Sequence, residues 1–295
     1  MGASAASLLQ AGASTAEPPR LRPGAARGDR RIPTGLVTGA SSGIGRDLVL
    51  RLLEQHWHVY ASVRNAGDAP TDSQELVFDV SDGDAIDRAA TQVDSLDAVV
   101  LNAGIAIAAP LEFLPPAELS RQLDVNVVGQ LRVLQAFLPA LRAARGRVVI
   151  IGSVGGRSAL PFLGAYAMSK FALEAMADAL RVELAPWGMH VSIVEPGTIA
   201  TAIWTKPQRA IEEFPPQAGE LYGERVEQFR KLATSRAASS AVPPAEVTKA
   251  VEHALTAARP KTRYIVGPDA KRRARVERLP DRLRDRLLTR FLFGS

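Results

Sequence analysis

Tyr166 and Lys170 are the two side chains whose spacing most clearly indicates chemistry. They are four residues apart, so on a helix they lie on the same face. A free tyrosine has a pKa of about 10, and lowering it by about three units requires on the order of 4 kcal/mol of preferential phenolate stabilisation. A neighbouring ammonium group stabilises a phenolate. The pair therefore indicates a phenol that exchanges a proton near neutral pH.

A glycine-rich turn near residue 40 indicates an anion site. Its glycines permit a tight turn and a close approach of the backbone, and the helix that follows offers unpaired N–H groups to a phosphate. An apolar strand before the turn and a helix after it favour a pyrophosphate ligand. The turn residues expected at this ligand are Thr38, Gly39, Ser41, Ser42, Gly43, Ile44 and Gly45.

Short apolar runs alternate with helical patterns from residue 34 onward. The expected strands lie at 36–37, 59–63, 76–78, 98–101, 148–151, 191–194 and 264–266. The expected helices lie at 43–56, 82–95, 116–143, 164–185 and 244–258, with an irregular segment at 196–242. This alternation predicts a doubly wound, Rossmann-type α/β fold with three layers and a parallel seven-stranded sheet buried on both faces. Functional loops should then lie at the carboxyl ends of the strands.

The turn has the spacing G-x-x-x-G-x-G, followed later by the segments N-A-G and Y-A-M-S-K. With these segments the sequence resembles the short-chain dehydrogenase/reductase family over about residues 34–267. The residues that match the catalytic pattern of the family in order and spacing are Asn126, Ser153, Tyr166 and Lys170. The resemblance implies an NAD(P)-dependent oxidoreductase acting on CH-OH donors. Tyr166 would then give a proton to the carbonyl oxygen while hydride reaches the carbon.

The other three matched residues have distinct expected roles. Ser153 follows the fifth strand, where its hydroxyl can hydrogen-bond the substrate oxygen. Lys170, by the resemblance, also binds the ribose hydroxyls of the nicotinamide. Asn126 lies within a long helical pattern, although asparagine is a poor residue for a helix interior. In relatives such an asparagine bends the helix and holds a water that links the lysine to solvent.

The end of the second strand predicts the choice of cofactor. NAD sites place an acidic residue there for the ribose 2′-OH, whereas a 2′-phosphate needs positive charge. Val63 occupies that position, and Arg64 beside it can bind a phosphate through two donors. We therefore expect NADP(H) to be preferred, with NAD(H) as the alternative. Asp79 matches the residue that holds the adenine in relatives, and its alternative role is to cap the helix that begins near Asp82.

Loops after the later strands complete the expected cofactor site. Its further residues are Val80, Asn102, Ala103, Gly104, Pro196, Gly197, Thr198 and Thr201. The two threonines are candidate donors to the carboxamide or a phosphate, or else helix N-caps. No spacing of histidines indicates a metal site, and the chain contains no cysteine. We therefore expect no metal.

Apolar residues around the expected catalytic serine and tyrosine indicate a hydrophobic substrate. The segment 199–242 reads as a helical lid, and the candidate substrate residues are Ser153, Phe162 and Trp204. The segment after the last strand resembles the retinol and hydroxysteroid dehydrogenase branch, so we expect a retinoid, steroid or other lipid-like alcohol or carbonyl. Three alternatives remain open, namely a 3-oxoacyl-thioester reductase, a non-catalytic NAD(P)-binding regulator and a sugar-nucleotide epimerase.

The net charge of +5 over 295 residues is concentrated at the two ends. Residues 1–33 read as a disordered basic extension, residues 34–270 as the single oxidoreductase domain, and residues 271–295 as a basic amphipathic helix. Because the domain itself is acidic, nucleic-acid binding is not expected. The apolar stripe Leu279, Leu283, Leu287 and Phe291 favours packing on the domain, pairing with another subunit, or contact with an anionic membrane. We expect a cytoplasmic homodimer or homotetramer formed through the helices near 116–143 and 164–185.

Overall fold

The computed structural model describes residues 31–200 and 215–294, without the side chains of residues 238–240. Contacts divide the chain into two units, Met1–Arg31 and Ile32–Ser295. Every element below belongs to the second unit. The expected N-terminal extension therefore falls almost entirely outside the described residues.

A seven-stranded parallel sheet forms the centre of this unit, in the order β3-β2-β1-β4-β5-β6-β7. The strands are β1 (Thr34–Thr38), β2 (His58–Val63), β3 (Gln74–Val77), β4 (Ala98–Leu101), β5 (Arg147–Ile151), β6 (His190–Pro196) and β7 (Arg263–Val266). In the register, Val37 of β1 pairs with Ala61 on one side and Val100 on the other. The chain order reverses between β1 and β4, the position at which sheets of this type bind ligands. The doubly wound fold is confirmed.

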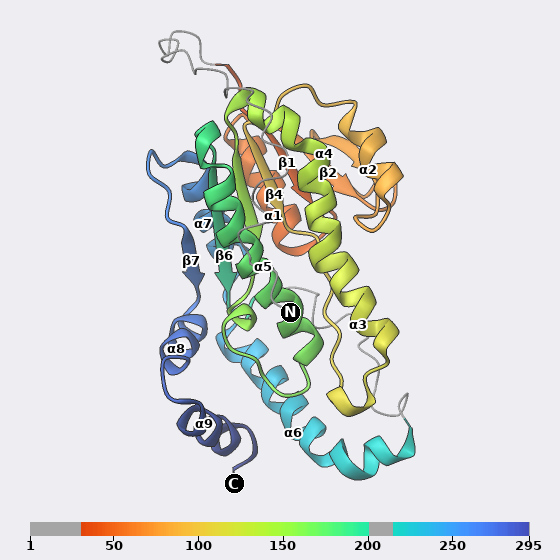
Figure 1. The fold of residues 1–295 in the computed structure, drawn as a ribbon, viewed down its shortest axis with the longest axis vertical. Helices are drawn as coiled ribbons and strands as arrows, with labels where there is room; N and C mark the ends of the chain where they lie inside the picture. Colours follow the sequence, from red (N-terminus) through yellow and green to blue (C-terminus); the bar gives the residue numbers. More distant parts are fainter. Residues whose placement is uncertain (1–30, 201–214, 295) are drawn as a thin grey trace, which may run out of the picture. The chain divides into compact units, whose positions relative to one another are not determined.

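Helices cover both faces of the sheet (Figure 1). One face packs against α1 (Gly43–Glu54) and α7 (Pro244–Thr256), and the other against α2 (Gly83–Ala90), α4 (Gly129–Ala144) and α5 (Gly164–Glu183). Each face has its own apolar core, which explains the continuous aliphatic strands. Several helices begin where the sequence provides a start signal. Asp82 caps α2 by accepting a hydrogen bond from the Ala85 N–H at 3.0 Å.

The helix expected at 116–143 is three consecutive segments. These are α3 (Pro116–Leu123), a π-helical turn η3 (Asp124–Val128) and α4. A π-turn inserts one extra residue into a helix and is common at functional sites. The π-turn contains Asn126.

The segment after β6 and the basic tail differ more from expectation. The segment 196–242, expected to be irregular with a helical lid, contains α6 (Pro216–Ser240), a single helix of 25 residues. The tail is two helices, α8 (Pro268–Val276) and α9 (Asp281–Phe293), separated at Pro280. Proline has no N–H for a helix interior, so the break follows from the sequence. Helix α9 contacts α6, and α8 contacts β7 and a short turn, η4 (Val154–Gly156), that follows β5. In the part of the chain that the structure describes, no helix is long and apolar enough to cross a membrane.

Candidate active site

The glycine turn lies beside the end of β4. The hydroxyl of Thr38 accepts hydrogen bonds from the backbone N–H groups of Asn102 and Ala103, at 2.8 and 3.0 Å. The side-chain amide of Asn102 donates back to the Thr38 carbonyl at 2.8 Å. These bonds connect two expected cofactor segments that are about sixty residues apart in the sequence. The structure therefore brings the T-G turn and the N-A-G segment together.

The geometry of the turn fits a phosphate ligand. Gly39 and Gly43 have φ values of +67° and +57°, in the left-handed region that favours glycine. A Cβ on Gly45 would lie 2.6 Å from the Asn102 amide nitrogen, so the backbone approach here excludes a side chain. Helix α1 begins at Gly43, and its N-cap Ser42 makes no side-chain capping bond to the described residues. The free N–H groups of α1 are therefore available to the pyrophosphate of a dinucleotide.

Arg64 and Asp79 follow the neighbouring strands β2 and β3, and their charges interact. Arg64 is exposed directly after β2. Burial works against ionisation of Asp79, but hydrogen bonds from the Ser81 N–H and hydroxyl, at 2.9 and 2.7 Å, and the charge of Arg64 leave the pKa of Asp79 below its usual value. Asp79 is not the helix cap, because Asp82 has that role. The side chain of Val80, the next residue after Asp79, is buried.

Ser153 and Tyr166 form a hydrogen-bonded pair at the end of β5. The Ser153 hydroxyl accepts from the Gly155 N–H at 3.0 Å and contacts the Pro196 carbonyl at 3.4 Å. Ser153 also hydrogen-bonds the Tyr166 hydroxyl. Both side chains are buried, with exposed fractions of 8% each. The glycine at 155 leaves room for this pair, since a Cβ there would lie 3.3 Å from the tyrosine ring.

Lys170 lies one helical turn after Tyr166 and is also buried. Its ammonium group donates to the Ile151 carbonyl at 2.9 Å and lies 5.7 Å from the centre of the Tyr166 ring. Burial lowers the pKa of Lys170 to about 8, and the nearby carboxylate of Glu174 opposes this shift. The lysine is therefore close to the phenol, and its charge is sensitive to pH near neutrality.

The protein groups alone do not make Tyr166 acidic, contrary to the sequence-based expectation. Burial raises the pKa of Tyr166 because it disfavours the phenolate. The hydrogen bond from Ser153 and the positive charge of Arg273 act in the opposite direction. A cation from α8, which the sequence analysis left in the basic tail, therefore acts on the phenol. When bound, an oxidised nicotinamide also adds positive charge to such a site.

Asn126 connects the loop after β4 to α5. Its side-chain oxygen accepts from the Ile105 N–H at 2.8 Å. Its amide donates to the Ile105 carbonyl and to the Ser169 hydroxyl, at 3.0 Å each. The π-turn η3 aims this side chain inward, since only 1% of it is exposed. The asparagine therefore positions the helix that carries the tyrosine and lysine.

The loop after β6 is held by an acidic residue that sequence analysis missed. The Thr198 N–H donates to a carboxylate oxygen of Asp269 at 2.7 Å, and the Gly197 N–H donates to the Val266 carbonyl at 2.9 Å. A Cβ on Gly197 would overlap the Asp269 carboxylate. The signal available in the sequence was the acidic residue in the first turn of α8, directly after a proline start. Thr201 lies outside the described residues.

Aromatic side chains from two helices meet at Phe162. This residue has a φ of +66° and lies between Ser153 and Tyr166 in the chain. Its ring makes edge-to-face contacts with Tyr222, Phe229 and Phe293, at centroid distances of 6.3, 5.7 and 6.4 Å. The first two belong to α6 and the third to α9. Of the two candidate substrate aromatics, Phe162 is at the centre of this cluster and Trp204 lies outside the described residues.

Comparisons with known proteins agree with this geometry. The family described as short chain dehydrogenase matches residues 34–212. The chain belongs to this family. The match covers the glycine turn, the Ser153–Tyr166–Lys170 segment and the loop after β6. The protein is therefore an NAD(P)-dependent oxidoreductase of the alcohol/carbonyl type.

Curated relatives of this short-chain dehydrogenase include hydroxysteroid and retinol dehydrogenases. Human 17-beta-hydroxysteroid dehydrogenase type 1 is 38% identical over 78% of this chain and 76% of its own. Human retinol dehydrogenase 16 is 35% identical over 80% of each chain. The NADPH-dependent 3-dehydrocapnine reductase of Ornithobacterium rhinotracheale is 35% identical over 85% of this chain and 94% of its own. The expected branch is confirmed.

Solved structures show the same fold. A short chain dehydrogenase from Burkholderia cenocepacia in complex with NADP superposes with a TM-score of 0.69 and 26% identity. The match covers 90% of this chain and 98% of the solved one. The fold and the family therefore agree.

Proposed function

We propose that this short-chain dehydrogenase uses NADP(H) to interconvert an alcohol and a carbonyl on a hydrophobic substrate. Tyr166 gives or takes the proton at the substrate oxygen, and Ser153 hydrogen-bonds that oxygen. Lys170 holds the nicotinamide ribose, and Asn126 positions the helix that carries both residues. The observation that carries this proposal is the buried Ser153–Tyr166 hydrogen bond at the carboxyl end of β5. The nicotinamide supplies or accepts the hydride when bound.

The experiment that tests this function follows NADPH absorbance with purified protein and a panel of steroid, retinoid and long-chain carbonyls. We expect turnover with at least one member, and loss of more than about a hundredfold in kcat for Tyr166→Phe, since a positioned proton donor contributes about this much. Turnover only of oxoacyl thioesters would favour the 3-oxoacyl reductase alternative. Binding of NADPH without any turnover would favour a cofactor-binding regulator.

Positive charge at the end of β2 supports a preference for NADP(H). Arg64 is exposed directly after β2, the strand that pairs with β1, and its charge acts on Asp79. The last residue of β2 is Val63, so the position where NAD sites place a carboxylate holds an apolar side chain. A guanidinium binds a 2′-phosphate through two donors, and this favours the phosphorylated cofactor.

The aromatic cluster around Phe162 supports a hydrophobic substrate and a lid role for residues 199–242. Tyr222 and Phe229 of α6 contact Phe162, and Tyr222 also donates to the Glu112 carboxylate at 2.8 Å. These contacts join α6 to the loop after β5 that carries the catalytic serine. A cover made of aromatic rings suits a steroid, a retinoid or an alkyl chain.

Exposed apolar residues on the outer faces of α4 and α5, with the π-turn before α4, support assembly into a homodimer or homotetramer. Val128, Leu131, Met168, Phe171 and Val182 have exposed fractions between 36% and 74%. A second copy of the chain would cover these side chains, as the resemblance implies. Light scattering after size-exclusion chromatography should give a dimer or tetramer for the wild type, and a monomer for Phe171→Asp would support this face.

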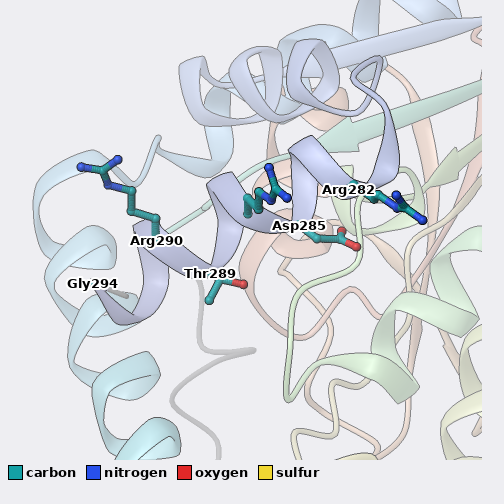
Figure 2. A pocket seen from close by; sticks show the side chains of 6 residues that line it. Arg282, Asp285, Thr289, Arg290 and Gly294 are labelled. Atoms are coloured by element: carbon teal, nitrogen blue, oxygen red, sulfur yellow. The ribbon is translucent and has the colours of Figure 1, made fainter.

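Helix α9 supports peripheral contact with an anionic membrane. Leu283, Leu287 and Phe291 lie on successive turns and are exposed by 45%, 45% and 51%. Arginines lie beside this column, along a shallow hollow (Figure 2). The residues that line the hollow are Arg282, Asp285, Arg286, Thr289, Arg290 and Gly294. An apolar column next to a basic one is the pattern of a helix that lies in a lipid interface.

A further inference from the structure

Helix α8 carries an arginine to the neighbourhood of the candidate catalytic tyrosine. Arg273 donates through Nη2 to the backbone carbonyl of Ser158, a buried residue in the loop between Ser153 and Tyr166. Its positive charge also acts on the Tyr166 phenol. The guanidinium is thus placed beside the candidate reaction site by the same helix whose Asp269 holds the loop after β6.

The Nε–H of Arg273 is a buried donor that has no hydrogen-bond partner among the described residues. Leaving a buried charged donor unpaired is costly, and buried polar groups in folded proteins are nearly always paired. One oxygen of Asp269, a turn earlier on α8, is also buried without a hydrogen bond to any described group. The neighbouring carboxylate therefore does not accept from this N–H, and the donor is available to a bound molecule.

Charges of both signs lie around Arg273. Arg236 of α6 lies close enough to Arg273 to oppose its protonated form, and Arg272 acts on Arg236 in the same way. Burial has the largest effect and lowers the pKa of Arg273, whereas Asp269, Tyr166 and Glu277 favour its protonated form. However, Glu277 already forms an ion pair with Arg284 at 2.8 Å, and Asp269 binds the Thr198 N–H. A buried guanidinium donor next to further arginines attracts a negatively charged group.

The apolar surface close to this donor belongs to the same loop. Phe162 lies four residues after Ser158, and its ring contacts aromatic rings of α6 and α9. Arg236 also stacks on Phe291 of α9, with its guanidinium 4.2 Å from the ring centre. A ligand that reaches Arg273 would therefore meet both a cation and an aromatic wall.

We propose that Arg273 binds an anionic group of the substrate, so that the substrate is an amphiphile with its anion a few bonds from the reacting carbonyl and its apolar part among the aromatic rings around Phe162. This inference rests on the proposed oxidoreductase function and names its substrate class. A carboxylate, a phosphate and a sulfonate share the required chemistry. Arg273 is then a residue that determines specificity.

The test compares an anionic substrate with the uncharged methyl ester of the same compound. Initial rates of NADPH oxidation are measured with 3-oxododecanoate and with its methyl ester, for the wild type, Arg273→Gln, Arg273→Lys and the exposed neighbour Arg275→Gln. We expect Arg273→Gln to lower kcat/KM for the acid at least thirtyfold and to change that for the ester less than threefold. Arg273→Lys should recover part of the loss, and Arg275→Gln should match the wild type. Equal losses on acid and ester, or no loss on either, would overturn the assignment.

A binding measurement separates this inference from the function on which it rests. Dodecanoate, which cannot be reduced at a ketone, is titrated calorimetrically into the wild type and Arg273→Gln, both saturated with NADP⁺. We expect binding to the wild type and at least tenfold weaker binding to the variant, whether or not any carbonyl turns over. Equal affinities would reject Arg273 as the anion site. If dodecanoate binding depends on Arg273 but no carbonyl oxidises NADPH, then the proposed reaction fails while the anion site stands.

Discussion

The side-chain amide of Asn126 donates to the hydroxyl of Ser169 at 3.0 Å, and that hydroxyl donates to the backbone carbonyl of Tyr166 at 2.7 Å. The π-turn is thereby connected to the helix that carries the candidate proton donor, although the two lie 43 residues apart in the sequence. The same asparagine satisfies both backbone groups of Ile105. Its expected role through a bound water is thus accompanied by a direct structural role.

Asn126→Ala should reduce both stability and activity. The substitution leaves the Ile105 N–H without its acceptor and removes the donor to the buried Ser169 hydroxyl, which costs about 1–3 kcal/mol in the free energy of unfolding. Gln122→Ala is the matched control, because Gln122 also pairs with Ile105 and with Ile107 but makes no bond to Ser169. Urea denaturation should give similar losses for both variants, with kcat lowered much further for Asn126→Ala. Equal kcat values would contradict a role for Asn126 in positioning α5.

The affinity for NADPH should decrease as the pH rises through about 8. Burial lowers the pKa of Lys170 to about 8, so the folded protein loses the ammonium charge at a pH where a free lysine keeps it. If that charge holds the ribose hydroxyls, then the dissociation constant measured by NADPH fluorescence should increase about two- to tenfold from pH 7 to pH 9. Lys170→Met should bind weakly and with little pH dependence over this range. A flat wild-type profile would count against the charged lysine as the ribose ligand.

Glu174 should make the protein less stable as the pH rises from about 4.5 to about 7. Burial and the charge of Glu195 raise the pKa of Glu174 to about 7, although Arg263 and Arg157 oppose the shift. Because its folded pKa is above the unfolded one, the folded state binds more protons in this range, and stability from this group is lost as the pH rises. The free energy of unfolding of Glu174→Gln, measured relative to that of the wild type, should therefore increase by on the order of 2 kcal/mol between pH 5 and pH 8.

Chemical denaturation at several pH values measures this effect. Glu183→Gln, an exposed position on the same helix α5, serves as the control and should follow the wild type. If the free energies of unfolding of the wild type and Glu174→Gln change by the same amount from pH 5 to pH 8, then the prediction is refuted.

Arg64→Ala should shift the cofactor preference toward NAD(H). Loss of a guanidinium that binds a 2′-phosphate costs about 1.5–3 kcal/mol, the range for a hydrogen bond to a charged group, or roughly ten- to a hundredfold in affinity. We expect kcat/KM for NADPH to fall by this factor while that for NADH stays within threefold. Arg46→Ala, an exposed arginine on α1, is a control for the loss of positive charge alone. Equal use of both cofactors by the wild type and Arg64→Ala would remove the proposal.

Helix α9 should bring the protein to anionic vesicles. Vesicles of phosphatidylcholine with phosphatidylserine should co-sediment the wild type, and pure phosphatidylcholine vesicles should not. The double variant Leu283→Gln/Leu287→Gln should pellet several-fold less, because it loses the exposed apolar column. Activity in free solution should persist, since neither side chain belongs to the candidate site. Identical, negligible pelleting of both proteins would exclude the membrane.

The sequence predicted the elements that local patterns determine. The strands, the glycine turn and helix α5 follow from aliphatic runs and start signals, and their bounds agree within about two residues. A helical lid was expected within 199–242, but the bounds of α6 were not, because this helix is mostly polar on all sides and its position depends on contacts with Phe162 and α9 rather than on periodicity. Asp269 and Arg273 were missed because their partners, Thr198 and Ser158, lie far away in the chain. Only tertiary structure shows such pairings.

The hydrogen bond from the Thr198 N–H to the Asp269 carboxylate has a thermodynamic consequence. It joins the first turn of α8 to the loop after β6, and α9 follows α8 after a break of four residues that ends at Pro280. A movement of α9 can therefore reach the loop after β6, which is part of the proposed dinucleotide site, through α8 and this hydrogen bond. If binding of α9 to a membrane changes the affinity for the dinucleotide by some factor, then the dinucleotide must change the affinity for the membrane by the same factor.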